Sequence, residues 1–355
     1  MCDNIKAKFF VPLMNGRREI YNNMENLANA QKYYLESTND RTDRTTEIEA
    51  KLSEYGACLL GGGDFYVSGV KMPDGTSLMG MGTATRLFLQ PEIESGFTVK
   101  IGSFSTIKDM FLCGSEEGIS LGDTVGERHG ILFKGTATTK DWLNQPKHSI
   151  IEACEIRSFT GGGLTCIDTG FSIRSALTAS NCHIFNCGAG INIPHFSEYH
   201  EFTNILCCEN IYGCINNGGN NVFVNCGFNS NAVAGYVIDN TDDKSLNNSH
   251  GSVVGCTFNH NGGDKGIAIQ LIKATNGYVF TGCQVFYSKI IVENSTWITF
   301  DAFNFGKNQV IEVKDGKLVM FTSCAFHGEP SITVEENENV KFINCFLKDG
   351  TPVET

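Results

Sequence analysis

The stretch VNCGFNSN, from Val224 to Asn231, recurs in altered form along the second half of the chain. VGCTFNHN starts at Val254, TSCAFHGE at Thr322 and INCFLKDG at Ile343. Each copy places a marker residue, usually cysteine, directly after a small or turn-forming residue. Repeats of this length are typical of a solenoid, whose units bury their apolar faces only by stacking. The markers are Cys154, Cys182, Ile205, Cys226, Cys256, Cys283, Phe303, Cys324 and Cys345, with successive spacings of 28, 23, 21, 30, 27, 20, 21 and 21 residues.

The residues around each marker alternate between two faces. In NVKFINCFL, from Asn339 to Leu347, the alternation has the period of a β-strand. Its phase shifts at Asn344, which predicts a bend between two short strands, because Asn and Gly tolerate the left-handed backbone conformation of such a corner. One face is predicted to hold Val340, Phe342, Cys345 and Leu347, and the other Lys341, Ile343 and Phe346.

These units predict an all-β fold, a parallel β-solenoid whose markers form one interior column. Consecutive turns of such a solenoid lie about 4.8 Å apart. Met110 is predicted to be an earlier member of the column. Because Ile205 and Phe303 also stand at marker positions, the cysteine there is interpreted as a packing residue rather than a reactive thiol.

The cysteine count sets the expected redox environment. The chain has 15 cysteines, an odd number, and its N-terminus shows no secretory signal. This pattern fits thiols that are kept reduced in a cytosol. No cysteine or histidine pair has the spacing of a zinc site, so we expect no metal bound by cysteine.

The segment from Ile48 to Leu89 carries a more specific pattern. It contains GDFYV, from Gly63 to Val67, and MPDGTSLMGMG, from Met72 to Gly82. These stretches resemble the opening of right-handed β-helix proteins of the pectate-lyase-like superfamily, in which a capping helix is followed by a strand, a Gly-rich turn and these motifs. The resemblance extends from about residue 45 to the C-terminus. It implies a single-stranded right-handed parallel β-helix and does not select an activity.

The N-terminal region is predicted to be helical. Apolar spacing predicts one helix over residues 16–37 and a second over residues 45–55, with Gly56 placed to end the second. The second helix is expected to cap the first coil of the solenoid. We therefore divide the chain into an attachment segment with its linker, 1–44, and a β-helix domain, 45–355. The predicted stripes are Ile20, Met24, Leu27, Gln31 and Tyr34 in the first helix, and Ile48, Leu52 and Tyr55 in the second.

Charge and architecture limit the class of partner. A formal net charge of -12 argues against nucleic acid, and no apolar run reaches the roughly 18 residues of a membrane span. The chain ends soon after Cys345 without an apparent cap, which favours oligomerisation or truncation. Together, these features resemble bacteriophage or prophage tail-spike and tail-fibre proteins. That resemblance implies synthesis in the host cytoplasm, a tail-like particle, a homotrimer, and an acidic or bacterial surface polysaccharide as partner. The alternative location is secreted or at the cell surface, with a signal removed.

The first candidate site lies around the marker Cys154. Glycosidases need two carboxylates, about 5–5.5 Å apart for retention and about 6.5–9.5 Å apart for inversion. Glu152 and Glu155 are predicted to point outward on either side of the bend, and His183 takes the position of Glu155 one coil later. These three residues are the predicted catalytic cluster. Arg157 is a candidate for holding a uronate, and Tyr199 and Tyr212 are candidates for stacking on sugar rings.

The second candidate is an acidic turn in the longest coil. Asp239, Asp242 and Asp243 offer the hard oxygen ligands that Ca²⁺ prefers, although an ordinary solvated acidic turn is the simpler interpretation. The residues Asn240 to Asp243 faintly resemble the NTD and DD carboxylates of polygalacturonases, but the GHG and RIK motifs of that family are absent.

Three functions stay open at this stage. The first is a phage-tail-like glycan-binding protein that cleaves its ligand with paired carboxylates and requires no cofactor. The second is a non-catalytic structural spike or adhesin. The third is a Ca²⁺-dependent lyase of the pectate-lyase kind. Extra chain length between Met110 and Cys154, and in the central coils, indicates that loops over the N-terminal and central coils form the groove for a glycan.

Overall fold

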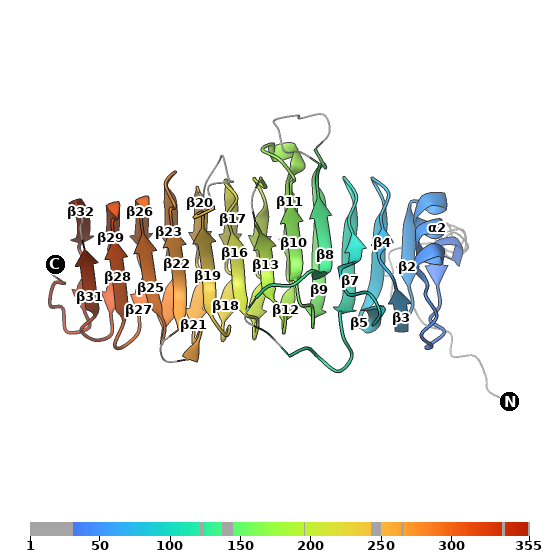
Figure 1. The fold of residues 1–355 in the computed structure, drawn as a ribbon, viewed down its shortest axis with the longest axis horizontal. Coiled ribbons are helices and arrows are strands. Elements are labelled where there is room, and N and C mark those ends of the chain that lie inside the picture. Colours follow the sequence, from blue (N-terminus) through green and yellow to red (C-terminus); the bar gives the residue numbers. More distant parts are fainter. Residues whose placement is uncertain are drawn as a thin grey trace, which may run out of the picture.

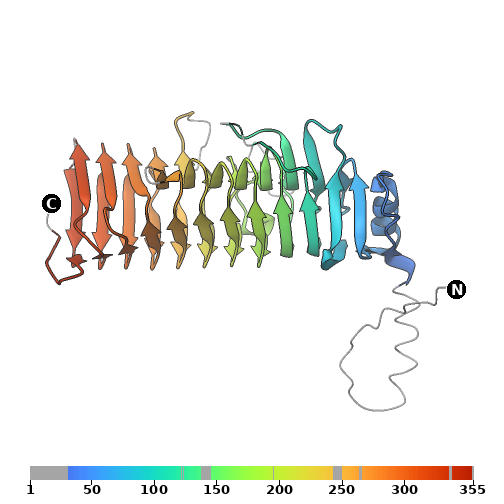
Figure 2. The same cartoon turned by 90° about the horizontal axis from the view of Figure 1, so that it is seen from below.

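A computed structural model shows an elongated solenoid built from parallel strands (Figure 1). It describes residues 31–120, 122, 124–136, 145–194, 196–242, 250–263, 266–335 and 338–353. Figures 1 and 2 show the coils following one another in chain order from the N-terminal to the C-terminal end. The fold is the predicted right-handed parallel β-helix.

Each coil contributes strands to two sheets. Sheet B has eleven strands in the described residues, and consecutive strands pair in parallel from coil to coil. They are β4 (Val70–Lys71), β6 (Gly96–Lys100), β8 (Arg128–Lys134), β10 (Gly162–Ile167), β13 (Ala189–Ile193), β16 (Tyr212–Asn216), β19 (Ala234–Asp239), β22 (Ile267–Ile272), β25 (Lys289–Glu293), β28 (Val310–Lys314) and β31 (Ser331–Glu335).

Sheet A bends once in each coil, so most coils give it two short strands with a corner between them. Its described strands are β1 (Tyr34–Leu35), β2 (Ala57–Leu60), β3 (Gly63–Val67), β5 (Ser77–Leu89), β7 (Thr106–Cys113), β9 (Ser149–Arg157), β11 (Leu177–Ser180), β12 (His183–Phe185), β14 (Glu201–Thr203), β15 (Leu206–Cys208), β17 (Asn221–Val224), β18 (Gly227–Asn229), β20 (Gly251–Val254), β21 (Thr257–Asn259), β23 (Tyr278–Thr281), β24 (Gln284–Phe286), β26 (Thr296–Asp301), β27 (Asn304–Phe305), β29 (Lys317–Thr322), β30 (Ala325–Phe326), β32 (Glu338–Ile343) and β33 (Phe346–Leu347).

The marker column is confirmed. Every marker residue, and Met110 before them, is at most 4% exposed. The residue before each marker adopts a positive φ, as at Asn225 (53°) and Asn344 (52°). In the last coil Ile343 and Phe346 are 42% and 44% exposed, which confirms the predicted outward set. Burial raises the pKa of the Cys187 thiol to about 12, in keeping with interior cysteines that pack rather than react.

A column of glycines lets the two sheets approach each other. Gly163, Gly190 and Gly213 occupy equivalent inward positions on successive sheet B strands. A Cβ at Gly190 would lie 2.7 Å from Cys207 Sγ and 2.5 Å from the carbonyl oxygen of Gly213. These coils therefore have no room for a side chain at that position.

A ladder of buried asparagines lines the corner between sheet A and sheet B. Asn231 donates from Nδ2 to the carbonyl of Cys207 at 3.2 Å and to Asn261 Oδ1 at 2.9 Å. Its Oδ1 accepts from the backbone N–H of Asn210 at 3.1 Å and from Asn210 Nδ2 at 3.2 Å. The corner is thus stabilised by hydrogen bonds between side chains of consecutive coils.

The N-terminal end is capped as predicted by the helix α2 (Thr45–Tyr55), which ends at Gly56 with a φ of 71°. Ile48 and Leu52 are fully buried, but Tyr55 is 40% exposed, so its expected place in the buried face is wrong. A short 3₁₀ helix, η1 (Ile173–Ser175), precedes β11. None of the described helices is both long enough and apolar enough to cross a membrane.

The predicted helix over residues 16–37 is wrong at its C-terminal end. Tyr34 and Leu35 form β1, which pairs in parallel with Leu59 and Leu60 of β2. Tyr34 was placed on the apolar stripe, but its ring packs on Gly61 instead. Residues 16–30 lie outside the described residues.

A fully buried histidine makes stability depend on pH. His200 Nδ1 accepts from the backbone N–H of Leu177 at 3.0 Å, so its neutral ring carries the proton on Nε2, 3.1 Å from Thr169 Oγ1. Burial, with a smaller effect of His148, lowers the pKa of His200 from 6.5 to about 3. As the pH falls below 6.5, the unfolded chain therefore binds a proton that the folded chain excludes.

We expect this histidine to cost about 2 kcal/mol of unfolding free energy when the pH is lowered from 7.5 to 5. Urea unfolding at the two pH values should show this loss in the wild type and not in His200→Gln. His327→Gln, which changes an exposed histidine, should keep it. If the His200→Gln variant folds poorly, NMR of the wild type decides: titration of the His200 ring near pH 6.5 in the folded protein would contradict the prediction.

Candidate functional site

The outward side chains of the N-terminal coils form two parallel rows. They stand on the carboxyl-side parts of β3, β5, β7, β9, β12 and β15, a surface we call the outer face. Alternate residues of a strand face opposite sides of the sheet, and pairing aligns equivalent residues from coil to coil. The first row is Asp64, Arg86, Phe111, Glu155, His183 and Leu206, and the second is Tyr66, Phe88, Cys113, Arg157, Phe185 and Cys208.

The segment that follows β7 covers part of this face. Gly114–Ser120, the roof segment, runs along the solenoid axis past β9 (Figure 1). The backbone of Ile119 exchanges hydrogen bonds with Asn186, which follows β12, at 3.2 and 3.3 Å. Arg128 Nη2, on β8, donates to the carbonyl of Gly114 at 2.7 Å and fixes the other end. The roof segment therefore extends from the coil of β7 to the coil of β12.

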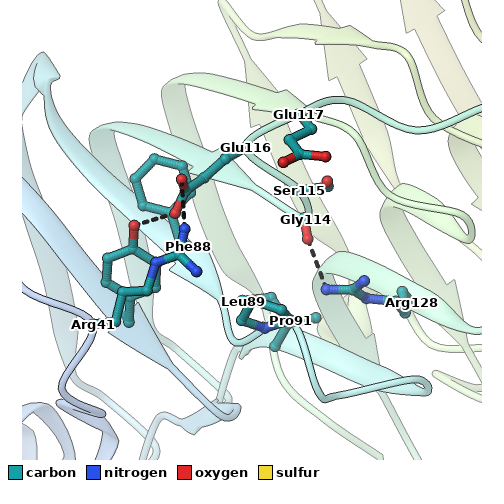
Figure 3. Close-up of a pocket in the computed structure, with 10 residues that line it drawn as sticks. Arg41, Phe88, Leu89, Pro91, Gly114, Ser115, Glu116, Glu117 and Arg128 are labelled. Carbon is teal, nitrogen blue, oxygen red and sulfur yellow. Dashed lines mark hydrogen bonds and ion pairs between the residues drawn. The ribbon is translucent and has the colours of Figure 1, made fainter.

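A pocket of about 340 Å³ opens between the roof segment and the first coils (Figure 3). Tyr66 and Phe88 form its apolar side, with stacked rings 5.1 Å apart at an angle of 19°. Each is only 6% exposed, so little of either ring is open to a ligand. The remaining lining is Arg41, Leu89, Pro91, Gly114, Ser115, Glu116, Glu117 and Arg128.

Glu116 is the best-fixed carboxylate in this pocket. Its Oε2 lies 3.1 Å from Arg41 Nη2, and its Oε1 accepts a short hydrogen bond from the Tyr66 hydroxyl. Burial and the hydrogen bond to Glu116 raise the pKa of Tyr66, so the phenol stays a donor at neutral pH. Figure 3 shows Glu116 directed toward Arg41, with Glu117 beside it on the roof segment.

Arg157 lies two coils beyond Phe88 in the same row of the outer face, and aromatic rings flank it. Its guanidinium carbon is 4.8 Å from the ring centre of Phe111 and 5.8 Å from that of Phe185, both within cation–π range. Its Nε is buried and has no hydrogen-bond partner. Arg157, predicted to hold a uronate, is thus positioned by stacking rather than by an acidic partner.

The predicted catalytic residues lie beside Arg157. Glu155 and His183 are register partners on β9 and β12, which confirms the predicted alignment. Glu152 is on the other side of the bend at Ala153, aligned with Lys108 and Ser180. No hydrogen bond or ion pair joins Glu152, Glu155 and His183 to one another in the described structure. His183 instead packs against Phe185, with the ring planes tilted by 31°, and approaches Cys208 Sγ at 3.2 Å through its Nε2.

The two predicted stacking tyrosines are not brought together. Tyr199 precedes β14, has a φ of 66° and donates its backbone N–H to Gly219. Tyr212 begins β16 on sheet B, at the opposite end of the coil from Tyr199. Neither lines the pocket under the roof segment.

The predicted Ca²⁺ ligands can be placed only in part. Asp239 ends β19, and its Oδ1 accepts from the backbone N–H of Thr241 at 3.0 Å. Asp242 follows in the turn, and Asp243 lies outside the described residues. Within the described ranges, no three His, Cys, Asp or Glu side chains are grouped closely enough to hold a metal ion.

The pocket residues come from five separate segments: the linker before α2, β3, the end of β5, the roof segment and β8. The charged ones are Arg41 in the linker, Glu116 and Glu117 in the roof segment, and Arg128 on β8. The sequence did indicate the region, because the long interval between Met110 and Cys154 predicts an inserted segment there. It did not indicate the residues, which share no period.

No family model matches the sequence, and no curated protein does either. Solved structures do match over most of the chain. The A-module of the mannuronan C-5 epimerase AlgE4 from Azotobacter vinelandii is 12% identical, with a TM-score of 0.60, over 88% of this chain and 93% of that one. An α-1,3-glucanase catalytic unit from Streptomyces thermodiastaticus is 12% identical, with a TM-score of 0.58, over 90% of this chain and 68% of that one.

A third neighbour is the full-length tailspike protein 2 of an Escherichia coli bacteriophage. It is 15% identical, with a TM-score of 0.55, over 86% of this chain and 40% of that one. At such identities the likeness concerns the fold and leaves activity open. By fold, this chain is similar to right-handed parallel β-helix proteins that include epimerases, a glucanase and a phage tailspike.

Proposed function

We propose that this chain is a polysaccharide-binding β-helix protein, with its binding site in the pocket under the roof segment and on the adjoining outer face. The observation that carries the proposal is the composition of that pocket. An aromatic pair, Tyr66 and Phe88, lines the pocket together with Arg128 and the fixed carboxylate Glu116, which accepts from the Tyr66 hydroxyl. An apolar wall, with charged groups beside it that can bond hydroxyls, makes a chemically suitable glycan site.

Hydrolysis of the bound glycan is the finer part of the proposal. Glu116 and Glu117 are two carboxyl groups on the wall of one pocket. Glu116, held by Arg41 and Tyr66, is assigned the role of base or nucleophile, and Glu117 that of the acid that protonates the leaving oxygen. The bond between the anomeric carbon and that oxygen breaks, and water supplies a hydroxyl to the carbon and a proton to the enzyme.

The likeness to a tailspike supports a setting in a tail-like particle, with the chain as a homotrimer. Two other neighbours are named for polysaccharides, mannuronan and α-1,3-glucan, which supports a glycan ligand. Glu152, Glu155 and His183 remain a prediction for a second catalytic cluster on the same face. A structural spike without activity and a Ca²⁺-dependent lyase are the competing outcomes of the test below.

The test is incubation with a panel of capsular, O-antigen and pectic polysaccharides. Affinity electrophoresis measures binding, the reducing-end assay measures hydrolysis, and absorbance of unsaturated products measures a lyase reaction. We expect hydrolysis by the wild type and a loss of at least about 100-fold in Glu116→Gln and in Glu117→Gln, with binding retained. Glu329→Gln, an exposed carboxyl group on a C-terminal coil, is the matched control. Light scattering of the same samples gives the oligomeric state.

The outcomes separate the alternatives. Binding without any product supports a spike or adhesin, and an unsaturated product formed only with Ca²⁺ supports the lyase. Activity that survives both pocket substitutions and disappears in Glu155→Gln transfers the chemistry to the predicted cluster. If the protein binds no polymer in the panel, the proposal of a polysaccharide-binding protein is wrong.

A further inference from the structure

Cysteines of consecutive coils stand next to each other at three places in the marker column of the described structure. Cys324 and Cys345 form the pair nearest the C-terminal end, on the coils of β28–β30 and β31–β33. The pairing of β29 with β32 and of β30 with β33 places these two cysteines directly opposite each other. The other groups are Cys154 with Cys182, and Cys226 with Cys256 and Cys283.

The spacing of Cys324 and Cys345 suits a disulfide bond. Opposite residues on adjacent parallel strands lie about 4.8 Å apart, and disulfides join Cα atoms about 4.4–6.8 Å apart. Both side chains point into the interior, where they are 1% and 3% exposed. The thiol of Cys324 donates to Cys345 and lowers the pKa of Cys345 to about 7, while the same contact raises the pKa of Cys324. Cys345 is therefore partly thiolate, the nucleophilic form, at neutral pH.

The cover over the cysteines differs from group to group. Cys154 and Cys182 lie between Met110 and Ile205, so a coil held by sheet pairing closes the column on both sides of them. Paired coils enclose the central group of three cysteines in the same way. Cys345 has a paired coil on the side of Cys324 alone in the described structure.

The segment that follows β33 covers the other side of Cys345. The backbone N–H of Val353 donates to the carbonyl of Cys345 at 2.9 Å, and the N–H of Leu347 donates to the carbonyl of Thr351 at 2.8 Å. A cavity of about 770 Å³ lies beside this segment, and Leu347, Thr351 and Val353 line it. We therefore expect this cover to open more readily than a paired coil, and the cavity to give a small disulfide access to Cys345.

We propose that Cys324 and Cys345 form a disulfide bond when the protein meets a small disulfide oxidant such as glutathione disulfide, and that the bond fastens the coil of β31–β33 to the coil before it. The thiolate of Cys345 attacks one sulfur of the oxidant, whose S–S bond breaks and releases one glutathione thiolate. Cys324 then loses its proton to solvent and attacks the Cys345 sulfur, which releases the second glutathione. Two protein thiols are oxidised, and one disulfide is reduced to two thiols.

The test oxidises the folded, fully reduced wild-type chain with glutathione disulfide at mildly alkaline pH, and then alkylates the remaining thiols. Trypsin cleaves after Lys317, Lys341 and Lys348, so the two cysteines fall in different peptides. We expect the unreduced peptide map to contain these peptides joined, with a mass lower by two hydrogen atoms than their sum. Dithiothreitol should separate them. In the same sample Cys154 and Cys182 should be found as alkylated thiols.

Hydrogen exchange measures whether the bond fastens the coil. The bond joins positions 21 apart and so restricts the opened forms of this coil. We expect oxidation to slow amide exchange in β31 and β33 at least about tenfold and to leave exchange in β10 unchanged. Cys345→Ala should show no slowing after oxidation, whereas Cys182→Ala should respond as the wild type does. If Cys345→Ala folds poorly, the wild type with and without dithiothreitol gives the same comparison.

Four results would overturn the inference. They are the absence of joined peptides from the native protein, glutathione that stays attached to Cys345 as a mixed disulfide, a bond between Cys154 and Cys182 that forms as fast, and unchanged exchange in β31 and β33 after oxidation. Glycan binding does not enter this test. The pair lies at the opposite end of the solenoid from β3 and the pocket under the roof segment, so the proposed function is tested separately (Figure 1).

Discussion

Replacing Asn231 with alanine is expected to lower the free energy of unfolding by about 3 kcal/mol, because it removes four hydrogen bonds in a place water does not reach. Asn231 is 1% exposed. Its loss leaves the backbone N–H of Asn210 and the carbonyl of Cys207 without their partners. The substitution also interrupts the asparagine ladder, because Asn231 bonds both Asn210 in the preceding coil and Asn261 in the following coil.

Urea unfolding followed by circular dichroism measures this effect. The matched control is Asn304→Ala, which changes an asparagine at an exposed outward position of β27 and should alter stability by no more than about 0.5 kcal/mol. A loss below about 1 kcal/mol in Asn231→Ala would mean that the corner is stabilised mainly by apolar packing.

Gly190→Ala is expected to cost at least about 3 kcal/mol by overpacking, although it adds a single methyl group. The new Cβ would lie 2.5 Å from the carbonyl oxygen of Gly213 and 2.7 Å from both Cβ and Sγ of Cys207. Two of these three atoms are backbone or fixed to it, so a rotamer change of Cys207 does not relieve the clash. The chain itself must move, and neighbouring coils transmit that movement.

The control for space alone is Gly328→Ala, whose Cβ would meet its nearest neighbour, Lys307 Cα, at 3.8 Å. That variant should be within about 0.5 kcal/mol of the wild type. The double variant Gly190→Ala with Cys207→Ala tests the cause, because it removes Sγ and leaves the contact with Gly213. We expect only part of the stability to return; complete recovery would show that the thiol is the sole obstacle.

The sequence predicts the interior of this fold well because the interior is periodic. Cys226 and Cys345 occupy the same place in different coils, so each copy of the repeat adds evidence for the others. The sequence also predicts the bend at Asn344, since a positive φ restricts the choice of residue there. The same period gave the alignment of Glu155 with His183 across one coil.

The residues of the site cannot be predicted from the repeat, because irregular segments bring them together. Nothing in the period of the repeat relates Arg41 to Glu116, 75 positions further along the chain. Closeness in sequence is no better guide, because Tyr199 and Tyr212 belong to one stretch of chain and half a coil separates them in space. The chain length between Met110 and Cys154 indicated where an elaboration would lie, and the fold had to show which side chains it carries.

The roof segment has a mechanical consequence for the solenoid. In a repeat protein each coil normally holds only its two neighbours, so coils can fray one at a time from an end. Here Glu116 is tied back to Tyr66 on β3, while Ile119 is tied forward to Asn186 after β12. The roof segment thereby connects five consecutive coils, from that of β3 to that of β12. We therefore expect these coils to unfold together rather than one at a time from the N-terminal end.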